Sequence, residues 1–215
     1  MGRRPELLQQ TLTSLFLFCE FKHIIAINDF RDAETNEAFK ELCPTGQLIS
    51  LDHKLGHHAA VDHMYQHVKT DWIFHSEDDW LFNRTIELDR MTDVITRNPW
   101  MSGICLRSET DFELCVSDMN EIVYQKYDGV DFYRMDAMHD QWHGFTFNPH
   151  VAPVSTWRTF GPFSKFTKER HISRAMRKAG LVMPYLVDGG CIHNGWEDSV
   201  SHEGKPVPFW SRWFG

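Results

Sequence analysis

Residues 71–82 read Asp-Trp-Ile-Phe-His-Ser-Glu-Asp-Asp-Trp-Leu-Phe, and their pattern decides the fold. The apolar run at residues 72–74 predicts a short buried strand, because such runs of aromatic and β-branched residues are typical of strands covered on both faces. Three carboxylates follow closely, Glu77, Asp78 and Asp79. Ligands bind at the carboxyl ends of strands in open α/β sheets, so this acidic turn is the first candidate for a site.

Outward from this stretch, apolar periodicity predicts helices that alternate with short strands. The predicted helices span residues 5–18, 33–42, 56–68, 86–97 and 167–179. The predicted strands span residues 23–27, 47–51, 72–74, 103–106, 132–135 and 181–187. This order predicts an α/β fold with a largely parallel sheet flanked by helices. Asp29 and Asp52 each follow a predicted strand, so they are expected at the same edge of the sheet as residues 77–79.

The composition is that of one acidic globular domain. The chain has 215 residues, of which 42% are hydrophobic, with 22 Lys and Arg against 30 Asp and Glu. A formal net charge of −8 argues against binding nucleic acid through a broad basic face. We expect one domain over residues 1–205 and an aromatic tail at residues 206–215. That tail is open to three readings: a lid, a contact with a partner or membrane surface, or packing against the domain.

The cysteines and the apolar segments favour a cytoplasmic protein. No two of the five cysteines have the C-x-x-C spacing of a zinc or redox site, so reduced thiols are expected. The apolar stretch at residues 12–21 is interrupted by Thr13, Ser14 and Glu20, whereas a membrane-spanning helix needs ~20 apolar residues. We expect neither a signal peptide nor a membrane span. Contact with the inner membrane surface stays open.

The acidic cluster at residues 77–79 has two interpretations. Three adjacent carboxylates repel one another, and at a strand end they are partly dehydrated, so an opposite charge must compensate them. A divalent cation, Mg²⁺ or Mn²⁺, suits hard carboxylate oxygens and would also hold a diphosphate. The alternative is a solvated acidic turn that caps the helix beginning near Ile86.

Several segments occur along the chain in the order of a known family. They are Arg4-Pro5-Glu6-Leu7-Leu8 with Thr11-Leu12-Ser14-Leu15, then residues 24–29, 56–64, 77–79, 143–149, 168–180 and 191–195. In this order they resemble the GT-A glycosyltransferases, especially the inverting, family 2-like ones. Residues 77–79 are similar to the D-x-D-type motif of that family, with Glu in its first position. Residues 143–149 look like its acceptor-side strand.

The resemblance implies a Rossmann-like sheet and a metal-dependent transfer of sugar from a nucleotide-sugar to an acceptor hydroxyl. Asp79 would be the direct metal ligand and His193 a second ligand to Mn²⁺ or Mg²⁺. Glu169 would be the general base that deprotonates the hydroxyl as it attacks the anomeric carbon, with inversion in one displacement. The metal would stabilise charge on the departing diphosphate.

The same resemblance places further residues around the two substrates. Expected at the nucleotide-sugar donor are Arg4, Asp29, Glu77 and Asp78. Expected on the acceptor side are Trp142 and His143, with a saccharide or lipid-linked acceptor of polysaccharide biosynthesis. Trp142 would either stack on a sugar ring or pack in the core, and Trp157 is expected in the core.

The resemblance also predicts that one strand is missing. Family members carry a β-strand ahead of the helix that begins near Arg4, and here Met1 lies only three residues before Arg4. Loss of that strand would leave a gap in the sheet and an unpaired strand edge. Lower stability and weaker donor binding than in a protein with the strand are the expected consequences.

Two other functions and one other metal site stay open. A truncated or degenerate GT-A domain would bind a nucleotide-sugar without turnover, which the predicted gap favours. A metal-dependent phosphohydrolase would use the acidic cluster, although two-metal sites usually draw ligands from several strand ends. His63 and His67 have the i, i+4 spacing of zinc ligands on a helix, and the alternative is histidines that face solvent or the donor pocket.

Overall fold

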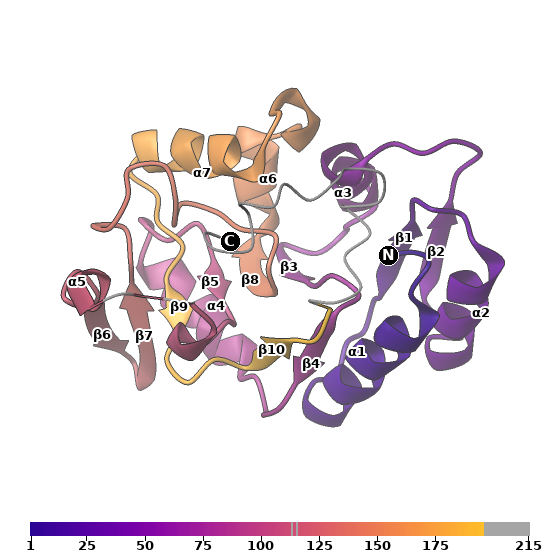
Figure 1. The fold of residues 1–215 in the computed structure, drawn as a ribbon, viewed down its shortest axis with the longest axis horizontal. Coiled ribbons are helices and arrows are strands. Elements are labelled where there is room, and N and C mark those ends of the chain that lie inside the picture. Colours follow the sequence, from indigo (N-terminus) through magenta and orange to yellow (C-terminus); the bar gives the residue numbers. More distant parts are fainter. Residues whose placement is uncertain (113, 115, 196–215) are drawn as a thin grey trace, which may run out of the picture.

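The structure is a computed structural model that describes residues 1–112, 114 and 116–195 (Figure 1). Its helices are α1 (Pro5–Phe18), α2 (Ala33–Leu42), α3 (His57–Tyr65), α4 (Leu88–Arg97), α5 (Val116–Met119), α6 (Val154–Phe160) and α7 (Glu169–Lys178), with 3-10 helices at Glu109–Asp111 and Phe163–Lys165. Its strands are β1 (Ile25–Asn28), β2 (Gln47–Ser50), β3 (Trp72–His75), β4 (Trp80–Phe82), β5 (Ile104–Cys105), β6 (Val123–Tyr127), β7 (Val130–Arg134), β8 (His150–Pro153), β9 (Tyr185–Leu186) and β10 (Cys191–His193). None of the described helices is both long and apolar enough to cross a membrane. The expected aromatic tail, residues 206–215, lies outside the described residues.

The described strands form one large sheet and two small ones (Figure 1). The six-stranded sheet has the order β3-β8-β5-β9-β7-β6, and its pairs are antiparallel except for β5 with β9. Strands β1 and β2 form a separate parallel pair, and β4 and β10 form an antiparallel pair. The predicted α/β fold, a sheet flanked by helices, is confirmed, and its pairing is mixed.

Helix α1 joins the β1–β2 pair to the rest of the molecule. Pro5 stands at its start, where a fixed φ and a missing N–H suit the first helical turn. The hydroxyl of Thr11 accepts the N–H of Trp80 at 3.0 Å, and the hydroxyl of Ser14 accepts the N–H of Phe82 at 3.1 Å. On its buried face α1 also packs against α2. The helix therefore fixes β4, the strand that leaves the acidic cluster.

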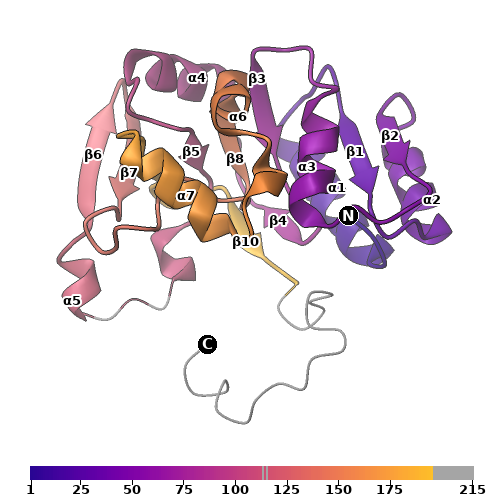
Figure 2. The same cartoon turned by 90° about the horizontal axis from the view of Figure 1, so that it is seen from above.

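Helices cover both faces of the large sheet. Figure 2 shows α4 on one face and α6 and α7 on the other. The buried core is divided accordingly: one cluster includes Val94, Ile104 and Phe132, and the other includes Ile172 and Met176. All five side chains are fully buried. These two layers hold β3 and β5 rigidly, and their carboxyl ends lead to the candidate site.

Residues 143–149 form a loop, so the prediction of a strand there is wrong. Strand β8 begins only at His150. The N–H groups of Gly144 and Phe145 donate to the Ser173 hydroxyl at 2.8 and 3.3 Å, so a side chain of α7 replaces a neighbouring strand as their partner. His143 has a φ of 66°, in the left-handed region that a regular strand excludes.

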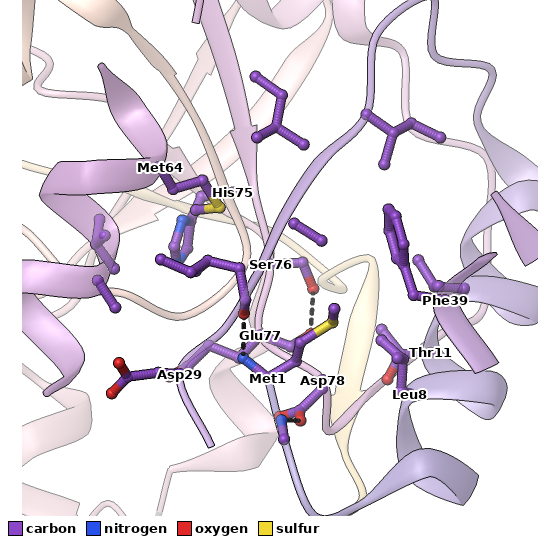
Figure 3. Close-up of a pocket in the computed structure, with 18 of the residues that line it drawn as sticks. Met1, Leu8, Thr11, Asp29, Phe39, Met64, His75, Ser76, Glu77 and Asp78 are labelled. Atoms are coloured by element: carbon purple, nitrogen blue, oxygen red, sulfur yellow. Dashed lines mark hydrogen bonds between the residues drawn. The ribbon is translucent and has the colours of Figure 1, made fainter. Parts of the chain in front are cut away.

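The predicted gap in the sheet is present. Among the described strands, β1 pairs only with β2, and β3 pairs only with β8. Between β1 and β3 lies a cavity of about 610 Å³ (Figure 3). One end of this cavity is polar, and the rest of its length is lined mainly by apolar side chains of α1, β1 and α3.

Candidate functional site

The candidate site is the polar end of the cavity between β1 and β3 (Figure 3). Asp29 follows β1 and residues 77–79 follow β3, so both strands bring carboxylates to the same place. Arg4 enters from the start of α1, and His57 enters from the start of α3. Asp52, expected at the same edge, does not join them: its side chain is 95% exposed and pairs with the next residue, a histidine.

Arg4 supplies the positive charge that the buried carboxylates require. Its guanidinium donates to Asp78 Oδ1 at 2.5 Å and to Asp79 Oδ2 at 2.9 Å. The N–H of Gly2 donates to Asp78 Oδ2 at 3.0 Å. Burial alone would lower the pKa of Arg4, yet the two carboxylates raise it above its ordinary value. Because Asp78 and Asp79 are buried and paired, the alternative of a solvated acidic turn is wrong.

Asp79 has one carboxylate oxygen without a partner among the described residues. This atom, Oδ1, is buried, whereas Oδ2 lies between the Arg4 guanidinium and Nε2 of His193, 3.3 Å away. Burial raises the pKa of Asp79, and the negative charge of Glu77 raises it further. The backbone N–H of Asn194 donates to the Asp79 carbonyl oxygen at 3.0 Å. A Cβ atom on Gly195 would lie 2.6 Å from the Asp79 Cβ, so glycine is required for this approach.

Asp79 and His193, the two predicted metal ligands, are placed so that they fit one divalent cation. Their side chains come within 3.3 Å of each other. Carboxylate and imidazole are both accepted ligands of Mn²⁺, and the unpartnered Oδ1 of Asp79 is a free oxygen for such an ion. Across the part of the chain that the structure describes, no three His, Cys, Asp or Glu side chains converge on one point, so water or a bound phosphate would complete the coordination. Arg4 would compete with the cation for Oδ2.

His57 joins the acidic cluster to the loop that precedes β8. Its Nε2 lies 3.3 Å from Glu77 Oε1, and its ring meets the Phe147 ring edge-on with centroids 4.5 Å apart. The next residue, His58, bonds through Nδ1 to the Phe166 carbonyl oxygen at 2.8 Å. The start of α3 therefore holds Glu77 beside the chain segments that lead into β8 and α7.

Asp29 shapes the loop that carries His57. Its two carboxylate oxygens accept the N–H groups of Leu55 at 2.7 Å and Gly56 at 2.9 Å. Gly56 has a φ of 86°, a conformation that glycine adopts without strain. Asp29 thus lies in the site with its oxygens already engaged by the protein, and its role at the donor stays a prediction.

Glu169 is the first residue of α7, and its carboxyl group has an unusual pKa. Burial raises the pKa of Glu169 to about 7; a hydrogen bond with Thr146 opposes the shift, and the charge of Glu77 adds to it. The charge of His57 acts in the opposite sense to that of Glu77. The Glu169 carboxyl group is thus within electrostatic reach of Glu77 and His57. Near neutral pH the group is divided between acid and carboxylate, which suits a general base.

Trp142 and His143, predicted on the acceptor side, lie at the other end of α7. Arg177 donates to the Trp142 carbonyl oxygen at 2.9 Å. Eight residues of helix separate Arg177 from Glu169, a distance of roughly 12 Å along the axis. His143 Nδ1 meets the Tyr185 hydroxyl at 3.0 Å, and burial lowers the pKa of His143 to about 4. Thr146 and the backbone of Phe147, later in the same loop, hydrogen-bond with Glu169.

Arg107 is a candidate that the sequence analysis missed. It follows β5, and only 14% of its side chain is exposed. Its guanidinium donates to Asn148 Oδ1 at 3.0 Å and lies 5.7 Å from the centroid of the Trp80 ring. Trp80 in turn packs against His193, with ring centroids 4.9 Å apart. The strand predicted at residues 103–106 ends just before Arg107, so the rule that ligands gather at strand ends would have found it.

Other histidines and Trp157 contact neighbouring side chains of the protein. His75 and His150 stack with ring centroids 5.1 Å apart, and burial lowers the pKa of both. The Gln47 amide meets Nδ1 of His67, one of the two histidines with zinc-like spacing, at 3.1 Å. Trp157, expected in the core, donates from its indole N–H to a buried aspartate, Asp62, at 2.7 Å.

Comparison with known proteins gives one family. The family model described as "Glycosyl transferase family 2" matches residues 3–149, which is most of the chain. A comparison of the sequence with curated proteins gives no match.

Solved structures of glycosyltransferases share the fold. The mannosyltransferase PcManGT from Pyrobaculum calidifontis, in complex with GDP-Man and Mn²⁺, has a TM-score of 0.66 at 10% identity, over 93% of this chain and 56% of its own. GalNAc-T7 with UDP, GalNAc and Mn²⁺ has a TM-score of 0.61 at 13% identity, over 95% of this chain and 43% of its own. TarS of S. aureus has a TM-score of 0.60 at 8% identity, over 89% of this chain and 34% of its own.

The family match and the structural matches carry different weight. The chain spans from about a third to just over half of the length of these solved relatives. At such low identity the structural matches establish the fold, whereas the family match extends over more than half of the chain. The chain therefore belongs to glycosyl transferase family 2, as a glycosyltransferase domain of the GT-A fold.

Proposed function

We propose that this protein transfers a sugar from a nucleotide-sugar donor to an acceptor hydroxyl, with the help of a divalent cation and with inversion at the anomeric carbon. The observation that carries the proposal is that the acidic cluster interacts with two kinds of group, a histidine at Asp79 and a buried carboxyl group near Glu77. Asp79 and His193 are placed to share a cation, and Glu169, with a pKa of about 7, interacts with the same cluster through Glu77. The family match supports the reaction class.

The donor side of this proposal is built from the acidic cluster and its neighbours. Asp79 and His193 would hold Mn²⁺ or Mg²⁺, and such an ion would supply positive charge that stabilises a departing diphosphate. Two of the solved neighbours are complexes with Mn²⁺ and a nucleotide or nucleotide-sugar, which supports this assignment. Arg4 and residues 77–78 line the diphosphate, and Asp29 acts by fixing the loop before α3.

The acceptor side depends on Glu169. Its carboxylate takes the proton of the acceptor hydroxyl while that oxygen attacks the anomeric carbon. The new glycosidic bond forms as the bond to the diphosphate oxygen breaks, and the electron pair leaves with the diphosphate. A pKa near the working pH suits this role, because a base must be deprotonated and still able to accept a proton.

The first experiment is a binding screen of UDP-, GDP-, dTDP- and CMP-sugars by thermal shift and calorimetry, with Mn²⁺ or with EDTA. Binding to the folded state raises the melting temperature by mass action, so one nucleotide class should stabilise the protein only with Mn²⁺. Failure of every donor to bind a folded protein would contradict the proposal.

A paired variant then tests the base. Glu169→Gln should bind the donor as wild type does and lose transfer, whereas Glu41→Gln, at an exposed position of α2, should keep both. Normal transfer by Glu169→Gln would show that another group is the base.

The alternative function is donor binding without turnover. The gap between β1 and β3 favours it, because a site whose walls are not joined by one sheet is less rigid, and catalysis requires rigid placement. Manganese-dependent donor binding with neither transfer nor donor hydrolysis would select this alternative.

A further inference from the structure

Positive charge is concentrated on α6 and α7, although the protein is acidic as a whole. Residues 154–180, which include both helices, have seven of the chain's 22 Lys and Arg and only one of its 30 Asp and Glu. That one acid is Glu169, which is hydrogen-bonded to Thr146 in the loop before β8. The other charged side chains of this segment are all positive at neutral pH.

Three of these cations form a row along the exposed side of α7. Arg170, Arg174 and Lys178 are four residues apart, so their side chains lie above one another on one side of the helix. All three are exposed, whereas Ile172 and Met176 are buried against the sheet. The row extends over roughly 12 Å of helix.

The cations of the row act on one another and on their neighbours. Partial loss of hydration, and then the positive charges of Arg174, Arg170 and Lys168, lower the pKa of His171. Within the part of the chain that the structure describes, no Asp or Glu side chain forms an ion pair with Arg170, Arg174 or Lys178. Like charges four residues apart destabilise a helix, so the row does not serve folding.

Helices α2 and α4 differ from α7 because they mix both signs on their exposed sides. The exposed residues of α2 include Glu37, Lys40 and Glu41. On α4, Arg90 pairs with Glu87, the residue just before the helix, at 2.7 Å. Mixed signs are typical of a helix that faces only water. The uniform sign on α7 indicates a partner with negative charge.

An exposed tryptophan lies at the C-terminal end of the row. Trp142 is 38% exposed, and its carbonyl oxygen accepts a hydrogen bond from Arg177 at 2.9 Å. Tryptophan is enriched at the boundary between lipid headgroups and acyl chains, because its ring is apolar and its N–H is polar. Basic residues together with Trp on one surface are typical of proteins that lie on anionic membranes. Figures 1 and 2 show α7 on the outside of the molecule, where its exposed side can meet a flat partner.

We propose that the outer side of α7, with Trp142 beside its end, is a docking surface for a membrane that contains anionic lipids. The side chains of Arg170, Arg174 and Lys178 meet lipid phosphates, and the Trp142 ring enters the headgroup region. This surface goes beyond the proposed transfer reaction and does not depend on it.

The test measures how the full chain sediments with lipid vesicles, without donor or metal. One kind of vesicle is phosphatidylcholine alone, and the other has phosphatidylglycerol as about a third of its lipid. The row variant combines Arg170→Gln, Arg174→Gln and Lys178→Gln.

A matched control variant removes the same amount of charge elsewhere. It combines Lys22→Gln, Lys40→Gln and Lys69→Gln, which are exposed positions outside α7. Circular dichroism checks that both variants fold, as expected for exposed substitutions.

Wild type should bind the phosphatidylglycerol vesicles and not the neutral ones, and added salt should weaken the binding. The row variant should bind about 100-fold more weakly, because each Lys or Arg near an anionic surface contributes roughly fivefold. The control variant should bind nearly as wild type does. Trp142→Ser should weaken binding at high salt as well, because contact of the ring with lipid is not screened.

Three results would overturn the proposal: no vesicle binding by folded wild type, equal binding to both kinds of vesicle, or equal losses in the two triple variants. Binding to heparin, a soluble anionic chain, without binding to vesicles would also overturn it, because the surface would then fit a polyanion. Donor binding is measured separately in the screen of nucleotide-sugars, so failure of one proposal leaves the other standing.

Discussion

Arg4 is the residue on which the charge balance of the site depends. It neutralises Asp78 and Asp79 in the absence of any other cation, and it shares Asp79 Oδ2 with the proposed metal position. Arrival of a divalent cation with a diphosphate would therefore exchange one positive partner of Asp79 for another. The released guanidinium would lie beside the diphosphate, where a planar, always charged donor is well suited to phosphate oxygens.

Replacing Arg4 should make stability depend on metal. We expect Arg4→Gln in EDTA to lose about 3–5 kcal/mol of unfolding free energy, the usual effect of breaking a buried ion pair. Mn²⁺ should restore part of this loss, because it compensates the same carboxylates. Urea denaturation with EDTA and with Mn²⁺ measures both effects. The matched control is Arg90→Gln, whose exposed pair with Glu87 is worth only ~0–1 kcal/mol. Equal losses in the two variants would contradict the assignment.

Glu169 should make stability depend on pH. Its pKa is about 7 in the folded protein and 4.5 as an unperturbed side chain, so the folded state binds the proton more tightly. The stability that this proton contributes is fully present below pH 4.5 and is lost as the pH rises through 7. Glu169→Gln does not titrate, so we expect it to be more stable than wild type at pH 8, by about 1–3 kcal/mol. Urea denaturation from pH 4 to 8 tests this, and a difference independent of pH would refute it.

The roles of the candidate site residues stay predictions, and the contacts between them were predicted only in part. Asp79 and His193 are far apart in sequence, and their resemblance to family motifs predicted that they meet, as they do. The pairing of Arg4 with the cluster was not predicted, because sequence shows the charges but not which opposite charge reaches them. The places of Trp142 and His143 depend on a loop whose path is set by hydrogen bonds to α7.

At the scale of elements, the bounds of helices with strong apolar periodicity were predicted well, and the strands next to loops were predicted poorly. The helices predicted at residues 5–18 and 33–42 are confirmed without a shift. The hairpin of β6 and β7 was only half predicted, although Asp128-Gly129 at its turn is a strong hairpin signal. The strand predicted at residues 181–187 shortens to β9, since Pro184 lacks the N–H that a strand interior needs.

The loop before β8 should depend on one hydroxyl of α7. Ser173 is fully buried, and its Oγ accepts from Gly144 and Phe145. Ser173→Ala would leave these buried N–H groups without their partner, so we expect a loss of about 1–3 kcal/mol in unfolding free energy. Ser155→Ala on α6, an exposed position, should change stability by less than about 0.5 kcal/mol. Urea denaturation measures the unfolding free energy of both variants. If Ser173→Ala is as stable as Ser155→Ala, the proposed role of Ser173 is wrong.

At the scale of the whole molecule, the gap divides the sheet into parts of unequal stability. The β1–β2 pair has two strands, and isolated two-stranded sheets are marginal. The large sheet has six strands with helices on both faces (Figure 2). The first part therefore relies on α1 and α2 for its stability, and among the described strands none pairs it with the second part.

Hydrogen exchange should reveal this division. We expect the amides of β1 and β2, such as Ala26 and Ile49, to exchange at least tenfold faster than those of Ile104 and Val151 in the large sheet. The reason is that opening the small pair exposes fewer buried contacts. Exchange measured by mass spectrometry over minutes to hours tests the difference. Uniform rates across all four strands would mean that the molecule opens as one unit.

The acidic cluster is held by segments that lie far apart in the sequence, which has a consequence for biosynthesis. Gly2 and Arg4 bind Asp78 and Asp79, and Asn194 binds the Asp79 carbonyl oxygen. A nascent chain emerges N-terminus first at ~5–20 residues per second, so ~115 further residues follow Asp79 over roughly 6–23 seconds before Asn194 exists. During that interval the aspartates have Arg4 but not Asn194 or His193. The cluster therefore gains these contacts only after residue 194 has emerged, and a nascent chain stalled before residue 193 would carry the clamped carboxylates without the histidine of the proposed metal site.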